Sequence, residues 1–245
     1  MNSVIICEGS TDYSLLQYYM RKAYGWVDGR PGSIKFENNR SRDLIKHGND
    51  FLTIMSSGGC GNLLSAYNMV WERNNKCKPD LSDAITKVAI ITDRDEIGSE
   101  ANFIHSLIQE LNSHISIPLT PVSNNHWALV SMNTRTGIPL IFEILVMVIP
   151  FAETGALETF LLNAVSASDP YDAQIITKGK FFVQNADPLN KYLTKRCYKT
   201  KAEFDAYFCI RTAPEQFVKR QDILKGIPWE DYPKIQEDFK LLGDL

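Results

Sequence analysis

A short apolar run that ends in a carboxylate and a glycine constrains the fold of this chain most strongly. Residues 4–7 (Val-Ile-Ile-Cys) are apolar and mostly β-branched, which is typical of a buried strand. Glu8 follows where the strand should end, and Gly9 permits a tight turn there. One of residues 10–12 (Ser-Thr-Asp) can then cap a helix. Glu8 is therefore expected at the carboxyl end of a strand, where open α/β sheets hold their ligands.

A second acidic motif follows another apolar run about eighty residues later. Residues 87–92 have the pattern of a buried strand and lead directly into Asp93 and Asp95. If the two strands are neighbours in one parallel sheet, Glu8 converges with these aspartates. Carboxylates so close repel one another unless a cation neutralises them, and Mg²⁺ or Mn²⁺ is the usual one. The simpler alternative is that each acid faces water or caps a helix.

The order of the apolar segments predicts an α/β fold. Three strand patterns, each followed by a helical pattern, imply a parallel sheet flanked by helices with right-handed crossovers. Residues 126–132 and 138–150 are expected to form a hairpin that extends the sheet. Residues 25–49, rich in Gly, Asn, Arg and Asp, are expected to be an irregular surface connection.

The remainder of the chain is predicted to be mainly helical, with loops. We therefore expect a catalytic domain at 1–165 and a helical C-terminal extension, 166–245, packed on it. Residues 51–55 are expected to form a second strand, and Ser-Ser-Gly-Gly-Cys-Gly-Asn at 56–62 connects it to the next helix. This turn does not match a P-loop, so it either contacts a phosphate or is a tight turn beside the metal site.

The distribution of charge favours a polyanionic ligand for the later part of the chain. The net charge is −3, yet residues 174–225 hold eleven Lys and Arg against five Asp and Glu. A basic segment can hold a polyanion beside a metal, although a solvated helical face would look the same. The candidate nucleic-acid-binding residues are Lys178, Lys180, Lys195, Arg196, Lys199, Arg211, Lys219 and Arg220.

Cysteine usage and hydropathy give an expectation about location. The five cysteines form no C-x-x-C pair, and no signal peptide is evident. They are expected to be reduced thiols of a cytoplasmic protein. The most apolar run, 139–151, is too short to span a bilayer and includes Glu143, so no membrane association is expected.

The two acidic motifs together resemble a known domain. Glu8-Gly9 with Asp12 after one strand, and Asp93-Arg94-Asp95 after another, look like the TOPRIM domain of topoisomerases, primases, small RNA-maturing nucleases and OLD-type nucleases. The resemblance covers roughly residues 1–113, or up to 165 at the widest. It implies a Rossmann-like parallel sheet that binds Mg²⁺ at its strand ends.

Within that group the chain most resembles the stand-alone OLD-like proteins. The opening Glu-Gly-Ser-Thr-Asp and the Gly-rich turn fit them, and residues 156–162 resemble their Leu-Glu helix, which carries a further acidic ligand. That ligand would be Glu158. A downstream lysine assists catalysis in OLD nucleases; Lys201 matches best, and Lys199 is the alternative.

The resemblance implies a metal-dependent endonuclease acting on DNA or RNA with one or two Mg²⁺ or Mn²⁺ ions. Glu8, Asp93 and Asp95 would hold the first ion with Asp12 nearby, and Glu158 would help to hold a second. Lys201 would stabilise charge on the phosphoryl group. Whether Glu96 or Glu100 adds a ligand stays open.

Partners follow from the same resemblance. Several relatives belong to bacterial anti-phage systems and work with an ABC-type ATPase, and no ATPase motif is present here. A separate ATPase subunit is therefore expected. The alternative is a non-catalytic regulatory or interaction subunit that partners the ATPase. The apolar segment 126–150 is either core or the interface of a homo-oligomer.

Overall fold

A computed structural model describes residues 1–29, 40–46, 48, 50–214 and 219–245. The strands are β1 (Asn2–Cys7), β2 (Val27–Asp28), β3 (Arg40–Lys46), β4 (Asp50–Ser56), β5 (Lys87–Asp93), β6 (Ile117–Pro118), β7 (Trp127–Asn133) and β8 (Pro139–Ile149). The helices are α1 (Ser10–Tyr24), α2 (Leu63–Asn75), α3 (Ser99–Ser113), α4 (Leu157–Ser168), α5 (Pro170–Ala186), α6 (Arg196–Arg211), α7 (Arg220–Gly226) and α8 (Pro233–Asp238). Short 3₁₀ helices are η1 (Cys60–Asn62), η2 (Trp229–Asp231) and η3 (Lys240–Asp244).

The described strands form one sheet in the order β2-β3-β4-β1-β5-β8-β7-β6. The four central strands, β4, β1, β5 and β8, are parallel. The pairings β3–β4 and β7–β8 are antiparallel. The predicted mixed α/β class is therefore confirmed, with a parallel core, a hairpin that extends it and a helical C-terminal region.

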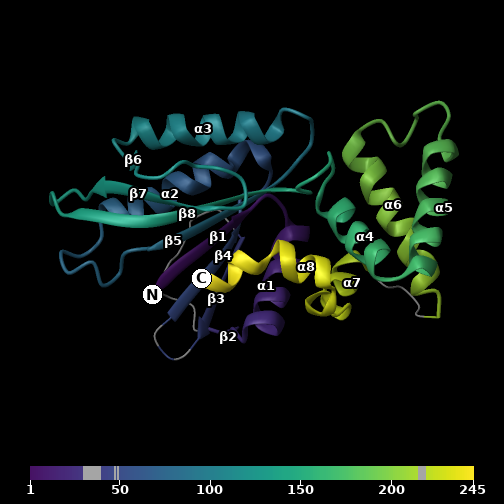
Figure 1. Ribbon diagram of the computed structural model, residues 1–245, viewed down its shortest axis with the longest axis horizontal. Helices are drawn as coiled ribbons and strands as arrows, with labels where there is room; N and C mark the ends of the chain where they lie inside the picture. The colour runs from purple at the N-terminus through teal and green to yellow at the C-terminus, as the bar shows by residue number, and fades with distance from the viewer. Residues whose placement is uncertain (30–39, 47, 49, 215–218) are drawn as a thin grey trace.

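Both faces of the parallel strands are buried, which explains their continuous apolar runs. Successive side chains of a strand point to opposite faces. Ile5 and Cys7 therefore belong to one apolar cluster, with α1, α4 and α8, whereas Val4 and Ile6 belong to another, with α2 and α3. In Figure 1, α2 and α3 lie on one side of the sheet, α1 and α8 lie on the other, and α4, α5 and α6 gather at one end.

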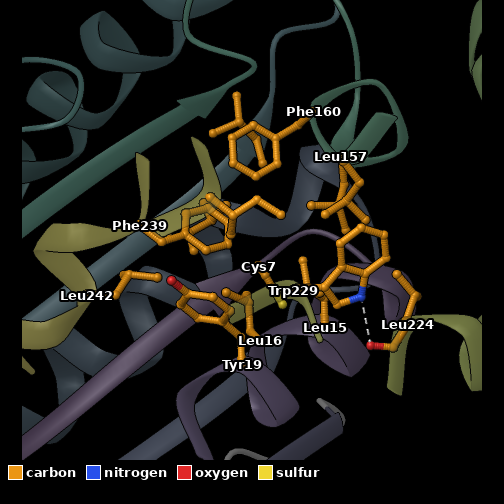
Figure 2. Packing of buried hydrophobic residues seen from close by; sticks show 14 of the residues in the cluster. Cys7, Leu15, Leu16, Tyr19, Leu157, Phe160, Leu224, Trp229, Phe239 and Leu242 are labelled. Carbon is orange, nitrogen blue, oxygen red and sulfur yellow. Dashed lines mark hydrogen bonds between the residues drawn. The ribbon is translucent and has the colours of Figure 1, made fainter. Parts of the chain in front are cut away.

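The C-terminal segment returns to pack on the first helix (Figure 2). The ring of Phe239 stacks on Phe160 of α4 at 5.0 Å and meets the edge of Tyr19 of α1 at 5.2 Å. The indole of Trp229 joins the same cluster and donates to the Leu224 carbonyl at 3.0 Å. Buried aromatic rings of this size dominate core energetics, so this cluster fixes α1 and α4 relative to each other.

The structure refines two local predictions. Residues 25–49 are not simply an irregular connection, because β2 and β3 add two antiparallel strands to the sheet, although 30–39, 47 and 49 lie outside the described residues. The side chains of β3 are mostly polar and exposed, so the apolar signal of a strand is missing. Of residues 10–12, Asp12 helps to cap α1 from its third position, but none of the three is the N-cap residue. That residue is Gly9, and Asp12 accepts a hydrogen bond from its N–H at 2.8 Å.

The division at 165/166 stays a prediction. Helix α4 runs across this position and packs against α5 and α6 as well as α8. All five cysteines are free thiols. Across the described ranges, none of the helices combines the length and the apolar character needed to cross a membrane.

Candidate functional site

A cavity of about 480 Å³ lies where the parallel strands end and three helices begin. Its walls come from the end of β1 and the start of α1, the end of β4, the end of β5, and the first turns of α4 and α6. Five carboxylates line it: Glu8, Asp12, Asp93, Asp95 and Glu158. Acids far apart in the sequence therefore meet at the carboxyl edge of the sheet, as the two strand-end motifs predict.

Glu8 is held in the cavity by donors from the neighbouring strand. Its Oε1 atom accepts the Thr92 hydroxyl and the Asp93 backbone N–H, the latter at 2.9 Å. Its own carbonyl accepts the N–H of Gly59 at 2.8 Å. Burial raises the pKa of the Glu8 carboxyl, and these hydrogen bonds offset part of that rise. Glu8 thus has a fixed position between β4 and β5.

The first turns of two helices face the acidic cluster. Asp12 lies in the first turn of α1, and Glu158 lies in the first turn of α4. Asp93 accepts the backbone N–H of Leu157, the first residue of α4, at 3.0 Å. A helix N-terminus carries partial positive charge and unpaired N–H groups, so both helices favour anions here.

The electrostatics of the cavity favour a bound cation. Burial raises the pKa of Asp12 to about 7, with further contributions from the charges of Glu8 and Glu158. The pKa of Asp93 is also raised well above its usual range. Burial is the largest cause, and repulsion from the four other carboxylates adds to it. Acids this close are ionised together at neutral pH only when a positive charge compensates them.

Glu158 provides a second indication. Its side chain is 3% exposed, and among the described residues its Oε1 atom has no hydrogen-bond partner. An unpartnered carboxylate oxygen in the protein interior is costly, because the group has lost its water without gaining a donor. A hard divalent cation would satisfy this oxygen.

Asp95 and Lys201 connect the cavity to the C-terminal helices. Asp95 forms an ion pair of 2.6 Å with Arg196 at the start of α6, and Arg196 also donates to the Gly155 carbonyl at 3.3 Å. Lys201, one turn later on α6, lines the cavity and makes no ion pair or hydrogen bond with any described residue. Its ammonium group is therefore available to an anionic ligand.

The carboxylates are not arranged as a ready-made metal site. Within the described ranges, no group of three or more His, Cys, Asp or Glu side chains forms such a set. Each of four acids uses one oxygen on a protein donor: Glu8 on Thr92 and Asp93 N–H, Asp12 on Gly9, Asp93 on Leu157, and Asp95 on Arg196. The donor set itself, all carboxylate oxygen, is the kind that Mg²⁺ or Mn²⁺ prefers.

The Gly-rich turn lies at the mouth of this cavity. Gly58 and Gly59 line it with φ values of +80° and +134°, in the range that favours glycine. The N–H of Gly59 is used by the Glu8 carbonyl. This contact favours the interpretation as a tight turn that holds Glu8, rather than a phosphate loop.

The predicted basic residues are not all brought together. Arg196 donates to Asp95 of the cavity, but neither it nor Lys199, the alternative to Lys201, is among the lining residues. Arg211 donates to the hydroxyls of Tyr207 and Tyr232, and Arg220 pairs with Asp205. The remaining positions are Lys178 and Lys180 on α5, Lys195 before α6, and Lys219 before α7.

Sequence reasoning missed several residues of the site. Thr92, which immediately precedes the Asp-x-Asp motif, donates to Glu8, and its place at a strand end could have suggested this. Cys197 and Thr200 line the cavity from α6, and no local pattern identifies them. Glu100, left open as a ligand, pairs instead with Arg94 and accepts from Asn124.

Comparison with known proteins places the chain in a family. A family model described as "Protein of unknown function (DUF3226)" matches residues 2–227. The chain belongs to this family. No curated protein matches the sequence. The chain is also similar to a solved structure described as "Crystal structure of hypothetical protein PH0156 from Pyrococcus horikoshii OT3", with 18% identity and a TM-score of 0.47 over 94% of this chain and 98% of that one.

Proposed function

We propose that this member of the DUF3226 family is a metal-dependent nuclease of the TOPRIM and OLD type, which hydrolyses phosphodiester bonds in DNA or RNA. One observation carries the proposal: five carboxylates from three separate segments line a single cavity together with Lys201. An acidic cavity by itself would repel a phosphodiester. The same cavity with a divalent cation would attract it, which makes phosphoryl chemistry the best fit.

The residues that would hold Mg²⁺ or Mn²⁺ are Glu8, Asp93 and Asp95, with Asp12 beside them. Glu158 would contribute to a second ion, because its buried Oε1 has no partner among the described residues. When bound, the metal would supply an acidified water and stabilise charge on the leaving oxygen. Burial and the N-termini of α1 and α4 keep these acids in place for that role.

The chain's own cationic groups would act on the substrate. Lys201 would place its ammonium beside the phosphoryl oxygens, where negative charge increases in the transition state. Arg196 holds Asp95 by its ion pair and ties the start of α6 to the Gly155 carbonyl. Arg196 is thus a positioning residue that keeps Lys201 aligned with the acids.

Replacing Lys201 by methionine tests this assignment. Methionine keeps most of the length of the side chain but removes its charge, so we expect cleavage to fall about 100-fold with metal binding unchanged. The measurement is cleavage of fluorescently labelled DNA and RNA in Mg²⁺, Mn²⁺ or chelator. Lys201→Arg should recover part of the rate, and Lys240→Ala is an exposed control that should change nothing. Equal rates for Lys201→Met and wild type would refute the role of Lys201.

One observation favours a second candidate function. Asp95 is already paired with Arg196, and the described acids do not form a ready-made metal set. The chain could then be a non-catalytic subunit that partners an ATPase. A stable complex with such an ATPase, with no cleavage in any metal, would favour this second function. A role in anti-phage defence and a cytoplasmic location remain predictions, the latter supported by the five free thiols.

A further inference from the structure

Lysines and exposed aromatic or aliphatic side chains occupy the connection between α5 and α6 and the first turn of α6, the helix that supplies Lys201 to the acidic cavity. Three of them are strongly exposed: Leu189 at 87%, Tyr192 at 72% and Tyr198 at 43%. We call this surface the basic aromatic rim, made of Leu189, Lys191, Tyr192, Lys195, Tyr198 and Lys199. Large apolar groups that remain exposed on a lysine-rich surface indicate a ligand that makes both apolar and ionic contacts.

Hydrogen bonds fix the backbone of the connection between α5 and α6, which carries part of this rim. The Asp187 carboxylate accepts the backbone N–H groups of Lys191, Tyr192 and Leu193 at 2.9, 2.7 and 2.8 Å. These hydrogen bonds also hold the pKa of Asp187 below its ordinary value, with a smaller contribution from the charge of Lys199. Tyr192 therefore lies exposed on a hydrogen-bonded turn. The only acid of that turn, Asp187, already accepts three backbone hydrogen bonds.

The first turns of α6 join the rim to the cavity. Tyr198 and Lys201 are three residues apart on this helix, so their side chains are neighbours on its surface. Arg196, at the start of the same helix, is fixed to Asp95 of the cavity. A chain that passes over Tyr198 would thus lead directly to Lys201 and the carboxylates.

Charge and ring contacts point to a polyanion with aromatic bases. Residues 174–201 hold seven Lys and Arg and a single acid, Asp187. Lys191 lies 5.1 Å from the ring centre of Tyr192, and Lys195 lies 5.8 Å from that of Tyr198. Protein interfaces are depleted in lysine, which argues against a protein partner here. Proteins that bind single strands combine basic grooves with stacking aromatics.

We propose that the basic aromatic rim binds single-stranded nucleic acid and directs it into the cavity. This inference rests on the proposed nuclease function and names its substrate class. Tyr192 and Tyr198 would stack on bases, and Lys191, Lys195 and Lys199 would contact the phosphates. A duplex would fit less well, because its bases stack on each other and offer no free face to an aromatic side chain.

Fluorescence anisotropy with chelator present tests the proposal without any cleavage. The probes are labelled oligo-dT and oligo-U of about 20 nucleotides and a duplex of the same length. We expect the full-length chain to bind a single strand more tightly than the duplex. Comparing its affinities for oligo-dT and oligo-U then shows whether it prefers DNA or RNA. The double variant Tyr192→Ala with Tyr198→Ala should weaken binding of the single strand about tenfold or more. Tyr171 is 69% exposed, close to the 72% of Tyr192, so Tyr171→Ala is the matched control and should bind like wild type.

A second variant separates stacking from charge. Lys191→Gln with Lys195→Gln should lower both the affinity and its dependence on salt, since fewer phosphate contacts release fewer counterions. The proposal is overturned if the duplex binds as tightly as the single strands, or if the double tyrosine variant binds like wild type. It is also overturned if the rim captures a protein and no nucleic acid. Binding without cleavage in any metal would refute the nuclease yet leave this inference standing.

Discussion

Replacing Asp93 by asparagine is expected to abolish metal-dependent cleavage without unfolding the protein. Asp93 lies at the end of β5, and its carboxylate faces four other acids of the cavity. Asparagine keeps the shape and an oxygen for the Leu157 N–H but removes the charge that a divalent cation requires. We expect cleavage to fall about 1,000-fold or more, because a catalytic cation contributes several kcal/mol to the transition state.

A fall in activity that comes with higher stability would exclude misfolding as its cause. The buried charge of Asp93 destabilises the metal-free chain, so the metal-free Asp93→Asn variant should melt at or above the wild-type temperature. Glu96→Gln is the matched control, because Glu96 lies three residues after Asp93, is exposed and is not among the residues that line the cavity. Full cleavage by Asp93→Asn and by Glu8→Gln would contradict the proposed metal site.

Asp12 is expected to make the stability of the metal-free protein fall as pH rises. Its pKa is raised from 3.8 to about 7 in the folded chain, mainly by burial. Between these values the native state therefore binds more protons than the unfolded state, so the free energy of unfolding decreases with pH across this window. The loss is complete above about pH 7 and amounts to roughly 2–4 kcal/mol.

The Asp12→Asn variant should remove this dependence. Near pH 8 the metal-free variant should melt roughly 5 to 10 °C above wild type, and near pH 4 the two should converge. Added Mn²⁺ should stabilise wild type near pH 8 and much less near pH 5, where protons compete for the same oxygens. Thermal melts followed by circular dichroism measure both effects.

A control in a different part of the surface makes this comparison specific. Asp231→Asn changes an exposed aspartate in η2, outside the cavity, and should leave the melting temperature unaltered at every pH. Identical pH profiles for wild type and Asp12→Asn would show that Asp12 does not carry a buried charge. Melting temperatures that ignore both Mn²⁺ and chelator would count against a tight cation site.

The parallel core was predictable because its sequence signal is local and strong. Residues 4–7 and 88–91 are apolar throughout, since both faces of their strands are buried. Because Glu8 and Asp93 lie at the ends of neighbouring parallel strands, they meet at the carboxyl edge of the sheet, and the conformation of the loops does not affect this. By contrast, the first half of β3 is polar and exposed, so its pairing with β4 is what reveals the full strand.

The remaining parts of the site depend on contacts that no local pattern contains. Arg196 reaches Asp95 across 101 residues of sequence, and its charge alone suggested only a nucleic-acid contact. Helix α5 carries Phe181 and Phe182 at 69% and 64% exposure, so these two apolar residues do not belong to its buried stripe. Lys201 came from the family resemblance, and its position on the cavity wall was set by packing of α6 against α4 and α5.

The central claim is that the five carboxylates of this cavity hold a divalent cation. The most direct measurement is a crystal structure of the full-length protein grown with Mn²⁺, with anomalous scattering recorded at the manganese edge. We predict an anomalous peak inside the cavity, within about 2.0–2.3 Å of oxygens from Glu8 and from Asp93 or Asp95. Crystals that contain Mn²⁺ elsewhere, or no manganese peak among these acids, would contradict it.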